Sequence, residues 1–259
     1  MRGLTRKPAS KRARAMSQAG VELITGNMGD RGTLERAMDG VHGVYAVTDF
    51  FRNGIAGEIA HGKLIADVAK SAGVQHYMFA SVASADRNTG IAHFDSKWQI
   101  EQHIEHLGLA ATILRPTIFM EDLTDSRYVP LVGWGMMRRI VGAQQPVKWI
   151  AVEDIGAVAA AAFANPGSFI GQKVSMAGDT VSIAEARAVF KKVAGKAPFS
   201  LYMPAMAFGR LVSKDLLTMW YWLHDHTLDA DVDATRKIHP GVMSMETWLK
   251  QKRGLKDGH

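Results

Sequence analysis

The sequence predicts an α/β fold in which helices cover a parallel sheet, followed by a smaller lobe that is mostly helical. Short apolar runs alternate with longer amphipathic segments from the first residues to Pro116, which is the pattern of β-α-β units. The runs are short and largely apolar, as expected for strands that are covered on both faces. After Pro116 the chain becomes irregular and rich in Met, Trp and Gly, and helical segments then dominate.

The first 25 residues predict a strand, a helix and a second strand. Residues 1–8 end a strand and enter a turn, because Pro8 disfavours a helical conformation at Lys7. Ser10 is a good N-cap for a helix over residues 11–18, and Gly20 closes that helix. Residues 21–25 form the next apolar strand.

Residues 26–72 continue the alternation. Gly26 to Asp30 is a loop, and Thr33 is the predicted cap of a short helix that ends near Met38. Residues 41–47 are a strand that ends at Thr48. Residues 55–72 follow as a long amphipathic helix.

The stretch from Tyr77 to Lys97 combines a strand end with reactive side chains. An apolar strand ends at Ser81, a polar loop follows, and a helix begins near His93. His93 and Lys97 are four residues apart and share one helix face. A hydroxyl, an imidazole and an ammonium group at the carboxyl edge of a sheet indicate a reactive site. The alternative is that these polar side chains are only solvated.

The remaining elements complete the sheet and build the lobe. Strands are predicted at residues 110–116, 146–150 and 172–176, and an Ala-rich helix opens at Val152. Ser182 caps a helix to about Val193, helices dominate from Pro204 onward, and residues 245–249 form a last short helix. The predicted domain division is residues 1–116 for the sheet and 117–259 for the lobe.

Composition excludes several classes of protein. The 259 residues include no cysteine, which excludes thiol catalysis, disulfides and cysteine-based zinc sites, and no metal site is predicted. No apolar run approaches the roughly 20 residues of a membrane span, and no secretory signal is present, so a cytoplasmic protein that does not bind membranes is the expectation.

The net charge of +6 is concentrated at the start of the chain. Arg2, Arg6, Lys7, Lys11, Arg12 and Arg14 all precede the first acidic residue, Glu22. Such a segment is typical of an organellar transit peptide, a nucleic-acid-binding arm, a solvated helix face or a phosphate site. Composition alone leaves these four interpretations open.

Several motifs in order along the chain resemble the NmrA-like family of atypical short-chain dehydrogenase-like proteins, and within it the redox-sensor branch. The motifs are Thr5-Arg-Lys-Pro8, Gly20-Val-Glu-Leu-Ile-Thr-Gly26, Val47-Thr48, Ala92-His-Phe-Asp-Ser-Lys97, Leu114-Arg-Pro-Thr117, Met120-Glu-Asp-Leu123 and Val152-Glu-Asp-Ile155. The resemblance implies a Rossmann-type fold that binds NADP(H). It also places the basic start inside the fold, which makes nucleic acid an unlikely partner and argues against a transit peptide.

The resemblance assigns cofactor contacts to residues from both parts of the chain. Arg6, with Lys7, would hold the adenosine 2′-phosphate, and an Arg at this strand end suits that phosphate on chemical grounds too. The remaining implied contacts are Asn27 and Met28 at the adenine, Thr48, Asp49 and Phe50 at the ribose and pyrophosphate, Lys97 at the ribose, and Phe119, Met120, Glu121 and Asp122 over the nicotinamide. For Arg6 the alternative is a surface arginine, and for Phe119 and Met120 it is packing of the lobe. Many relatives carry Asn where this chain has Asp122.

The resemblance also frames the chemistry of the site. Short-chain dehydrogenases use a Ser, a Tyr and a Lys, and Ser81 and Lys97 keep two of these places. Position 93, twelve residues after Ser81, is His instead of Tyr. Ser81 and His93 are therefore candidate catalytic residues. The first hypothesis is a redox-sensing or regulatory NADP(H) binder with a protein partner. The alternative is an NADPH-dependent oxidoreductase that acts on quinones or small carbonyl compounds.

The resemblance further implies that the chain begins at the second strand of the family's fold. The first strand and the glycine-rich turn that cradles the pyrophosphate are then expected to precede Met1 in a complete protein. With strand order 3-2-1-4-5-6, the absent strand would lie between the second and the fourth. A chain that begins at Met1 is expected to leave strand edges unpaired and to bind a dinucleotide weakly.

Overall fold

A computed structural model describes residues 1–126, 128–129, 132–210 and 212–257. Contacts between residues group the chain into two compact units. Unit 1 comprises Met1–Ala80, Ser96–Ile113 and Pro166–Gln172. Unit 2 comprises Ser81–Asp95, Leu114–Asn165 and Lys173–His259. Each unit contains segments from before and after residue 116. The division into residues 1–116 and 117–259 therefore stays a prediction.

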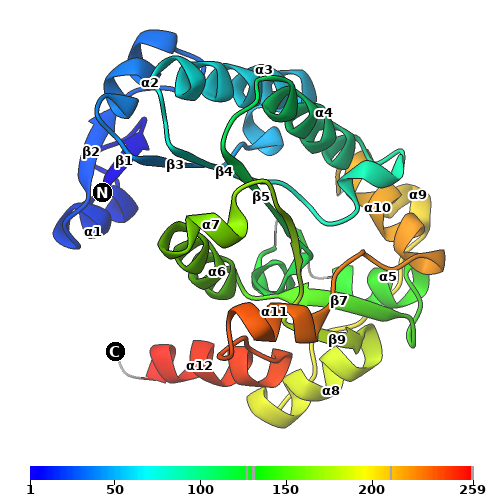
Figure 1. Ribbon diagram of the computed structural model, residues 1–259. Helices are drawn as coiled ribbons and strands as arrows, with labels where there is room; N and C mark the ends of the chain where they lie inside the picture. Colours follow the sequence, from blue (N-terminus) through cyan, green and yellow to red (C-terminus); the bar gives the residue numbers. More distant parts are fainter. Residues whose placement is uncertain (127, 130–131, 211, 258–259) are drawn as a thin grey trace. The chain divides into compact units, whose positions relative to one another are not determined.

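The elements follow the predicted β-α alternation (Figure 1). The strands are β1 Arg2–Thr5, β2 Glu22–Thr25, β3 Gly43–Ala46, β4 His76–Ala80, β5 Ala111–Pro116, β6 Ile118–Phe119, β7 Pro146–Ile150, β8 Lys173–Met176 and β9 Asp179–Ser182. The α-helices are α1 Lys11–Gln18, α2 Arg31–Met38, α3 Phe50–Ser71, α4 Ala92–His106, α5 Gly133–Ile140, α6 Val152–Ala164, α7 Pro166–Phe169, α8 Ile183–Ala194, α9 Ala205–Phe208, α10 Lys214–Asp225, α11 Val232–Ile238 and α12 Met245–Asp257. Two 3-10 helices are η1 Ala85–Arg87 and η2 Met120–Thr124. The predicted α/β class is confirmed, and α12 is longer than the short helix expected there.

Parallel pairing dominates the strands of unit 1. β1 and β2 run parallel with Leu4 opposite Ile24, and β3 and β4 run parallel with Val44 opposite Tyr77. β1 and β2 form a two-stranded sheet that is separate from the sheet containing β3 and β4. In the described part of the chain, β1 pairs only with β2, and β3 only with β4. The described strands β1 to β4 therefore belong to two separate sheets.

Local sequence signals explain the helix starts in unit 1. The Ser10 side chain accepts a hydrogen bond from the Ala13 amide at the start of α1, as predicted. The cap of α2 is Asp30, which accepts from the Gly32 amide, so the prediction of Thr33 as the cap is wrong. Thr33 instead donates its hydroxyl to the second oxygen of the same carboxylate, at 2.5 Å.

Helix α3 begins at Phe50, five residues earlier than predicted. Gly54 interrupts it with φ 68° and ψ 171°, a conformation that is essentially restricted to glycine. The α3 residues beyond this kink cover β3 and β4 together with α2 and α4 (Figure 1). Gly62 permits the close approach of α3 and α4, because a Cβ there would lie 2.4 Å from Ile100 Cδ1.

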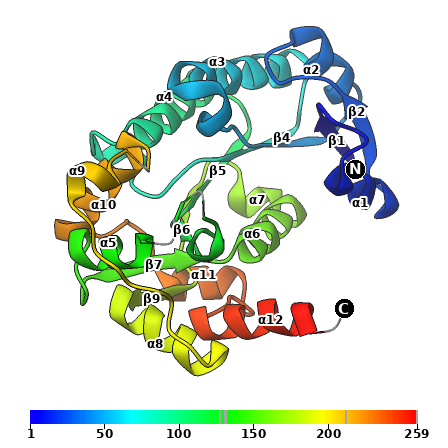
Figure 2. The ribbon, with the colours of Figure 1, turned by 180° about the vertical axis from the view of Figure 1, so that it is seen from behind.

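Unit 2 is built around β6, β7 and β9. β6 runs parallel to β7, and β7 runs antiparallel to β9 with Val147 opposite Val181. A reciprocal capping box of Ser182 and Glu185 starts α8. Helices α8 and α12 lie side by side (Figure 2). The core around them contains the aromatic side chains Trp134, Phe190 and Trp248.

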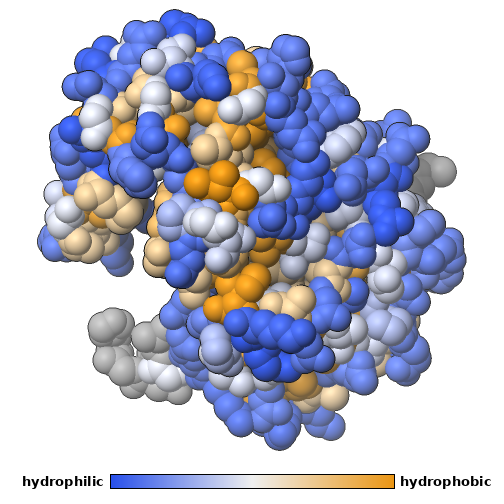
Figure 3. All heavy atoms as spheres, in the orientation of Figure 1, coloured by the Kyte–Doolittle hydropathy of each residue, from blue (hydrophilic) through white to orange (hydrophobic). Residues whose placement is uncertain are grey.

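At the upper left of Figure 3, near α2, hydrophilic surface is interrupted by hydrophobic patches. No helix within the described ranges has both the length and the apolar character that crossing a bilayer requires.

Candidate functional site

Lys97 lies in a buried polar cluster of unit 1 that also contains Thr48, Glu58 and Ser96; we call this the Lys97 cluster. Lys97 Nζ donates to Thr48 Oγ1 at 2.7 Å and forms an ion pair with Glu58 Oε1 at 3.0 Å. Thr48 Oγ1 donates to Glu58 Oε1 at 2.9 Å, and Ser96 Oγ donates to Glu58 Oε2. The end of β3, helix α3 and helix α4 therefore meet at one carboxylate.

Burial affects the pKa of Lys97 in this cluster. The side chain of Glu58 is 0% exposed and that of Lys97 is 12% exposed. Burial lowers the pKa of Lys97, and the Glu58 carboxylate opposes that shift by attraction and by accepting a hydrogen bond. The Lys97 ammonium also lies 5.3 Å from the centre of the Phe79 ring. The Lys97 side chain is consequently held in a defined position by Thr48 and Glu58.

Asp49 and Phe50 directly follow Thr48 of the Lys97 cluster, and α3 begins at Phe50. Asp49 is the N-cap residue of α3, and its carboxylate lies 3.4 Å from Arg52. Asn53 donates its side-chain amide to the Asp49 carbonyl at 2.9 Å. These contacts fix the short turn of α3 that precedes the kink at Gly54.

Arg6 and Lys7 follow β1 and are both exposed. Among the described residues, neither side chain has an ion-pair partner in the structure. The Lys7 amide donates to Thr5 Oγ1 at 3.2 Å, which shapes the turn after the strand. The two cations are thus available to an anion at the carboxyl end of β1.

The loop after β2 has a glycine spacing that the sequence prediction did not recognise. Gly26, Gly29 and Gly32 recur at every third residue between β2 and α2. However, Asn27 Oδ1 accepts from the Gly29 amide at 3.0 Å, and Asp30 accepts from the Gly32 amide at 3.1 Å. Since an acidic cap already fills this helix N-terminus, the loop does not offer a phosphate cradle.

Asn27 and Met28, the predicted adenine contacts, lie in this loop. Asn27 is exposed, and Met28 is half-buried. Met28 packs against the apolar core of unit 1 that includes Leu34 and Met38. The packing fixes the position of the loop, and the adenine contact stays a prediction.

His93 and Ser81 belong to unit 2. His93 Nδ1 hydrogen-bonds to Asp215 Oδ2, and the His93 amide donates to Asp215 Oδ1 at 3.3 Å. Asp215 lies in the first turn of α10, and the side chains of His93 and Asp215 are 16% and 17% exposed. Ser81 is buried, and its amide donates to the Leu114 carbonyl at 2.8 Å.

The segment Phe119 to Asp122 also lies in unit 2. Phe119 is 37% exposed, and Met120 is fully buried in the core. The Glu121 carboxylate accepts from Trp248 Nε1 at 2.9 Å and from the Val152 amide at 3.1 Å. Met120 and Glu121 therefore stabilise unit 2, and the predicted cofactor contacts of this segment stay predictions.

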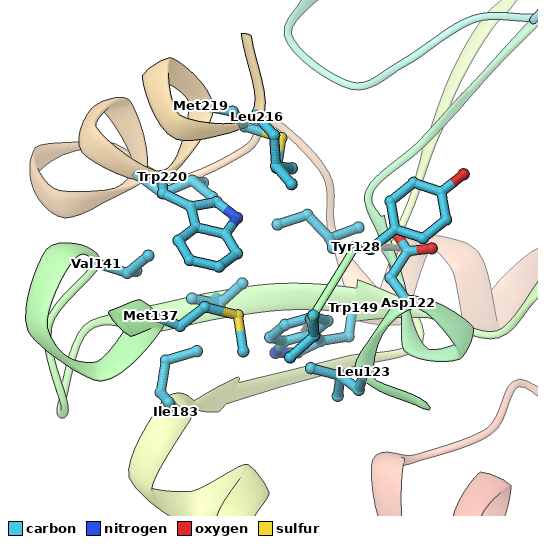
Figure 4. A pocket seen from close by; sticks show the side chains of 14 residues that line it. Asp122, Leu123, Tyr128, Met137, Val141, Trp149, Ile183, Leu216, Met219 and Trp220 are labelled. Atoms are coloured by element: carbon cyan, nitrogen blue, oxygen red, sulfur yellow. The ribbon is translucent and has the colours of Figure 1, made fainter. Parts of the chain in front are cut away.

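Asp122 lines a small cavity inside unit 2. The cavity has a volume of about 30 Å³, and its walls come mainly from apolar side chains such as Trp149 and Trp220. The polar atoms of Asp122 and Tyr128 lie together on one side of it (Figure 4). A cavity of this volume has room for water.

The structure adds two residues that the sequence did not reveal, Glu58 and Asp215. Glu58 occurs within an amphipathic helix, where a carboxylate is usually solvent-exposed. Asp215 follows Ser213 at a helix start, where an acidic residue is ordinary. Neither residue had a local signal, because the partner of each comes from a distant segment. Within the described ranges, no group of three His, Asp or Glu side chains could hold a metal ion.

Comparisons with known proteins agree with this architecture. A family model described as the NmrA-like family matches residues 1–249. An NmrA-like family domain-containing protein of Dictyostelium discoideum is 21% identical over 86% of this chain and 78% of its own length.

Two solved structures share the fold. NmrA, a negative transcriptional regulator in complex with NADP, aligns with a TM-score of 0.77 and 19% identity over 99% of this chain and 88% of its own. The NADPH-dependent quinone oxidoreductase QOR2 of Escherichia coli, complexed with NADPH, aligns with a TM-score of 0.77 and 18% identity over 97% and 89%. At this identity the alignments establish the fold.

Proposed function

Because the chain belongs to the NmrA-like family, a family of NAD(P)-binding proteins, we propose that it binds NADP(H) and acts as an oxidoreductase on a quinone or a small carbonyl compound. The observation that carries this proposal is helix α4. It presents His93 and Lys97 one turn apart, and each side chain is held by a carboxylate in its own unit. An imidazole and an ammonium held in this way are suited to proton donation and to binding a sugar hydroxyl.

The residues present fit the two ends of NADP(H). Arg6 and Lys7 are exposed cations at the end of β1, suited to a 2′-phosphate. The Lys97 cluster offers an ammonium group and the hydroxyl of Thr48, suited to the nicotinamide-side ribose. Asn27 and Met28 lie on the loop after β2, and Asp49 and Phe50 lie at the start of α3, all in the same unit. The likeness to proteins solved with NADP and with NADPH supports this choice of cofactor.

The chain's own residues would divide the remaining work. Bound NADPH supplies a hydride to the substrate carbon. His93 donates a proton to the substrate oxygen, because imidazole exchanges protons near neutral pH. Lys97 would hold the ribose through its ammonium group. Ser81 is the candidate that positions the substrate oxygen.

A turnover assay tests the proposal. NADPH oxidation is measured at millimolar NADPH over a panel of quinones and small aldehydes, with His93→Gln and Lys97→Met as variants. We expect turnover of at least one compound and a loss of about 10²-fold or more in kcat for His93→Gln. Arg12→Ala, on the exposed face of α1, is the control and should keep full activity. No turnover of any compound would contradict the proposal.

A second candidate, a redox-sensing regulator, is favoured by one surface feature. Phe199, Leu201 and Tyr202 are 51%, 53% and 52% exposed on one short segment of unit 2. Large apolar side chains clustered on a surface are typical of protein interaction sites. The likeness to the regulator NmrA supports the same interpretation.

Hydrogen exchange tests this second candidate without a known partner. If NADPH occupancy is signalled to a partner through this segment, amide exchange of residues 199–202 should change when NADPH is added. The exposed segment around Arg36 on α2 serves as a reference. Exchange that is identical with and without NADPH would count against a sensor.

A further inference from the structure

Asp215 is joined to His93 by more than one hydrogen bond. Oδ2 accepts from the His93 ring at Nδ1, and Oδ1 accepts from the His93 amide at 3.3 Å. Both residues belong to unit 2, at the starts of α4 and α10. One carboxylate therefore fixes both the backbone and the ring of His93.

This contact determines which ring nitrogen carries a proton. A carboxylate can only accept hydrogen bonds, so Nδ1 must be the donor. In the neutral ring Nδ1 then holds the single proton, and in the imidazolium Nε2 holds the second one. In the neutral ring Nε2 therefore carries the lone pair.

The electrostatics of Asp215 are consistent with a permanent charge. Burial acts to raise the pKa of Asp215, but the hydrogen bonds from the His93 ring and from the His93 and Ala92 amides outweigh it and lower the pKa. Asp95 lies in the same region, and burial and the Asp215 charge raise its pKa. The carboxylate facing His93 is thus the more acidic of the two.

We infer that Asp215 is the positioning residue of the proton donor: it holds His93 in the Nδ1–H form and directs Nε2 to the substrate. The inference rests on the proposed oxidoreductase function. In the reaction, the proton on His93 Nε2 moves to the substrate oxygen while the substrate carbon receives the hydride and its electron pair from NADPH. His93 is left neutral, the cofactor is left as NADP⁺, and Asp215 keeps its negative charge.

The Phe94 ring supports the same geometry. It is fully buried and meets the His93 ring edge to face, with ring centres 4.8 Å apart. An aromatic edge packed on the imidazole restricts its rotation. Asp215 therefore acts on a ring whose plane is already constrained.

The test combines NMR spectroscopy with kinetics on Asp215→Asn. In the wild-type protein, the ¹⁵N shifts of the His93 ring should report a protonated Nδ1 at neutral pH. In Asp215→Asn the Nε2–H form should gain population. The kcat for NADPH-dependent reduction should fall about 100-fold or more, with the KM for NADPH changed by less than about twofold. In a His93→Gln background, Asp215→Asn should have no further effect on kcat.

The control is Asp231→Asn. Asp231 caps α11 by accepting from the Ala234 amide at 2.7 Å, and it belongs to the same unit. It should leave the His93 ring signals and kcat unchanged. An equal loss in Asp231→Asn, or an additive loss in the His93→Gln background, would show a purely structural role and overturn the inference.

The NMR measurement tests the inference about Asp215, and the kinetic measurement also tests the proposed function. Absence of turnover in the wild-type protein contradicts the oxidoreductase, while the NMR arm still decides the state of His93. A wild-type ring that carries its proton on Nε2 overturns the inference whether or not the protein turns over a substrate. This measurement needs no variant, so it holds even where Asp215→Asn does not fold.

Discussion

Lys97 is the site residue whose neighbourhood the structure defines most completely. Sequence spacing and resemblance predicted it as a cofactor contact, and the structure places it beside Thr48, another predicted contact. Its counter-charge, Glu58, was not predictable from sequence. A carboxylate on a helix is recognised as buried only when the elements that cover it are known, and those come from positions 48 and 96–97.

The Lys97–Glu58 pair gives a prediction at the residue scale. Glu58→Gln leaves the ammonium group buried without its counter-charge and should lower the free energy of unfolding by about 3–5 kcal/mol. Lys97→Met combined with Glu58→Gln removes both charges and should be less destabilising than Glu58→Gln alone. Urea denaturation measures the free energy of unfolding of the wild type, of each single variant and of the double variant. A double variant whose loss equals the sum of the single losses would show that the two charges do not interact.

At the scale of elements, most helices and strands were predictable because their signals are local. Ser10 and Ser182 cap α1 and α8 as the sequence indicates. The errors arise where two local signals compete or where tertiary contacts decide. Asp30 displaces Thr33 as the cap of α2, and the antiparallel pairing of β7 with β9 has no signature in either strand alone.

Gly54 gives a prediction at this scale. Its φ of 68° and ψ of 171° interrupt α3, and side chains other than hydrogen are strained in this conformation. Gly54→Ala should lower the free energy of unfolding by about 1–3 kcal/mol. Gly156→Ala is the matched control, because Gly156 lies within α6 and no atom lies within 4 Å of its Cβ position. It should be neutral or stabilising by up to about 1 kcal/mol. Equal effects at both positions would disprove the strained turn.

The two lysine partners of Glu246 allow us to predict how acid affects the contact between α12 and α8. It accepts from Lys192 at 2.8 Å and lies 2.7 Å from Lys250. Hydrogen bonds from these two lysines lower the pKa of Glu246 from 4.5 to about 2. Because the folded pKa is depressed, the carboxylate stabilises the fold above pH 4.5, and this contribution is lost as the pH falls towards 2.

Urea denaturation of the wild type and Glu246→Gln tests this pH dependence. The difference in stability between the two proteins should be largest at neutral pH and should shrink as the pH approaches 2. It should also shrink in about 1 M salt, where charges are screened within about 3 Å. A difference that is independent of pH and salt would assign the effect of the substitution to packing.

At the scale of the whole molecule, the family and the α/β class were predictable from the order and spacing of motifs. The grouping of residues was not. Helix α4 belongs partly to each unit, with the boundary after Asp95, and no composition change marks that point. In unit 1, β1 pairs with β2 and β3 pairs with β4 in separate sheets.

Calorimetric titration of the chain with NADPH and with NADH tests most directly the proposal that this chain binds NADP(H). We expect NADPH to bind measurably at millimolar concentrations and more tightly than NADH, because we propose that Arg6 and Lys7 bind its additional phosphate. Arg6→Ala should remove most of this preference, and Arg12→Ala should retain it. No detectable binding of NADPH, or equal affinity for both dinucleotides in the wild-type protein, would contradict the account.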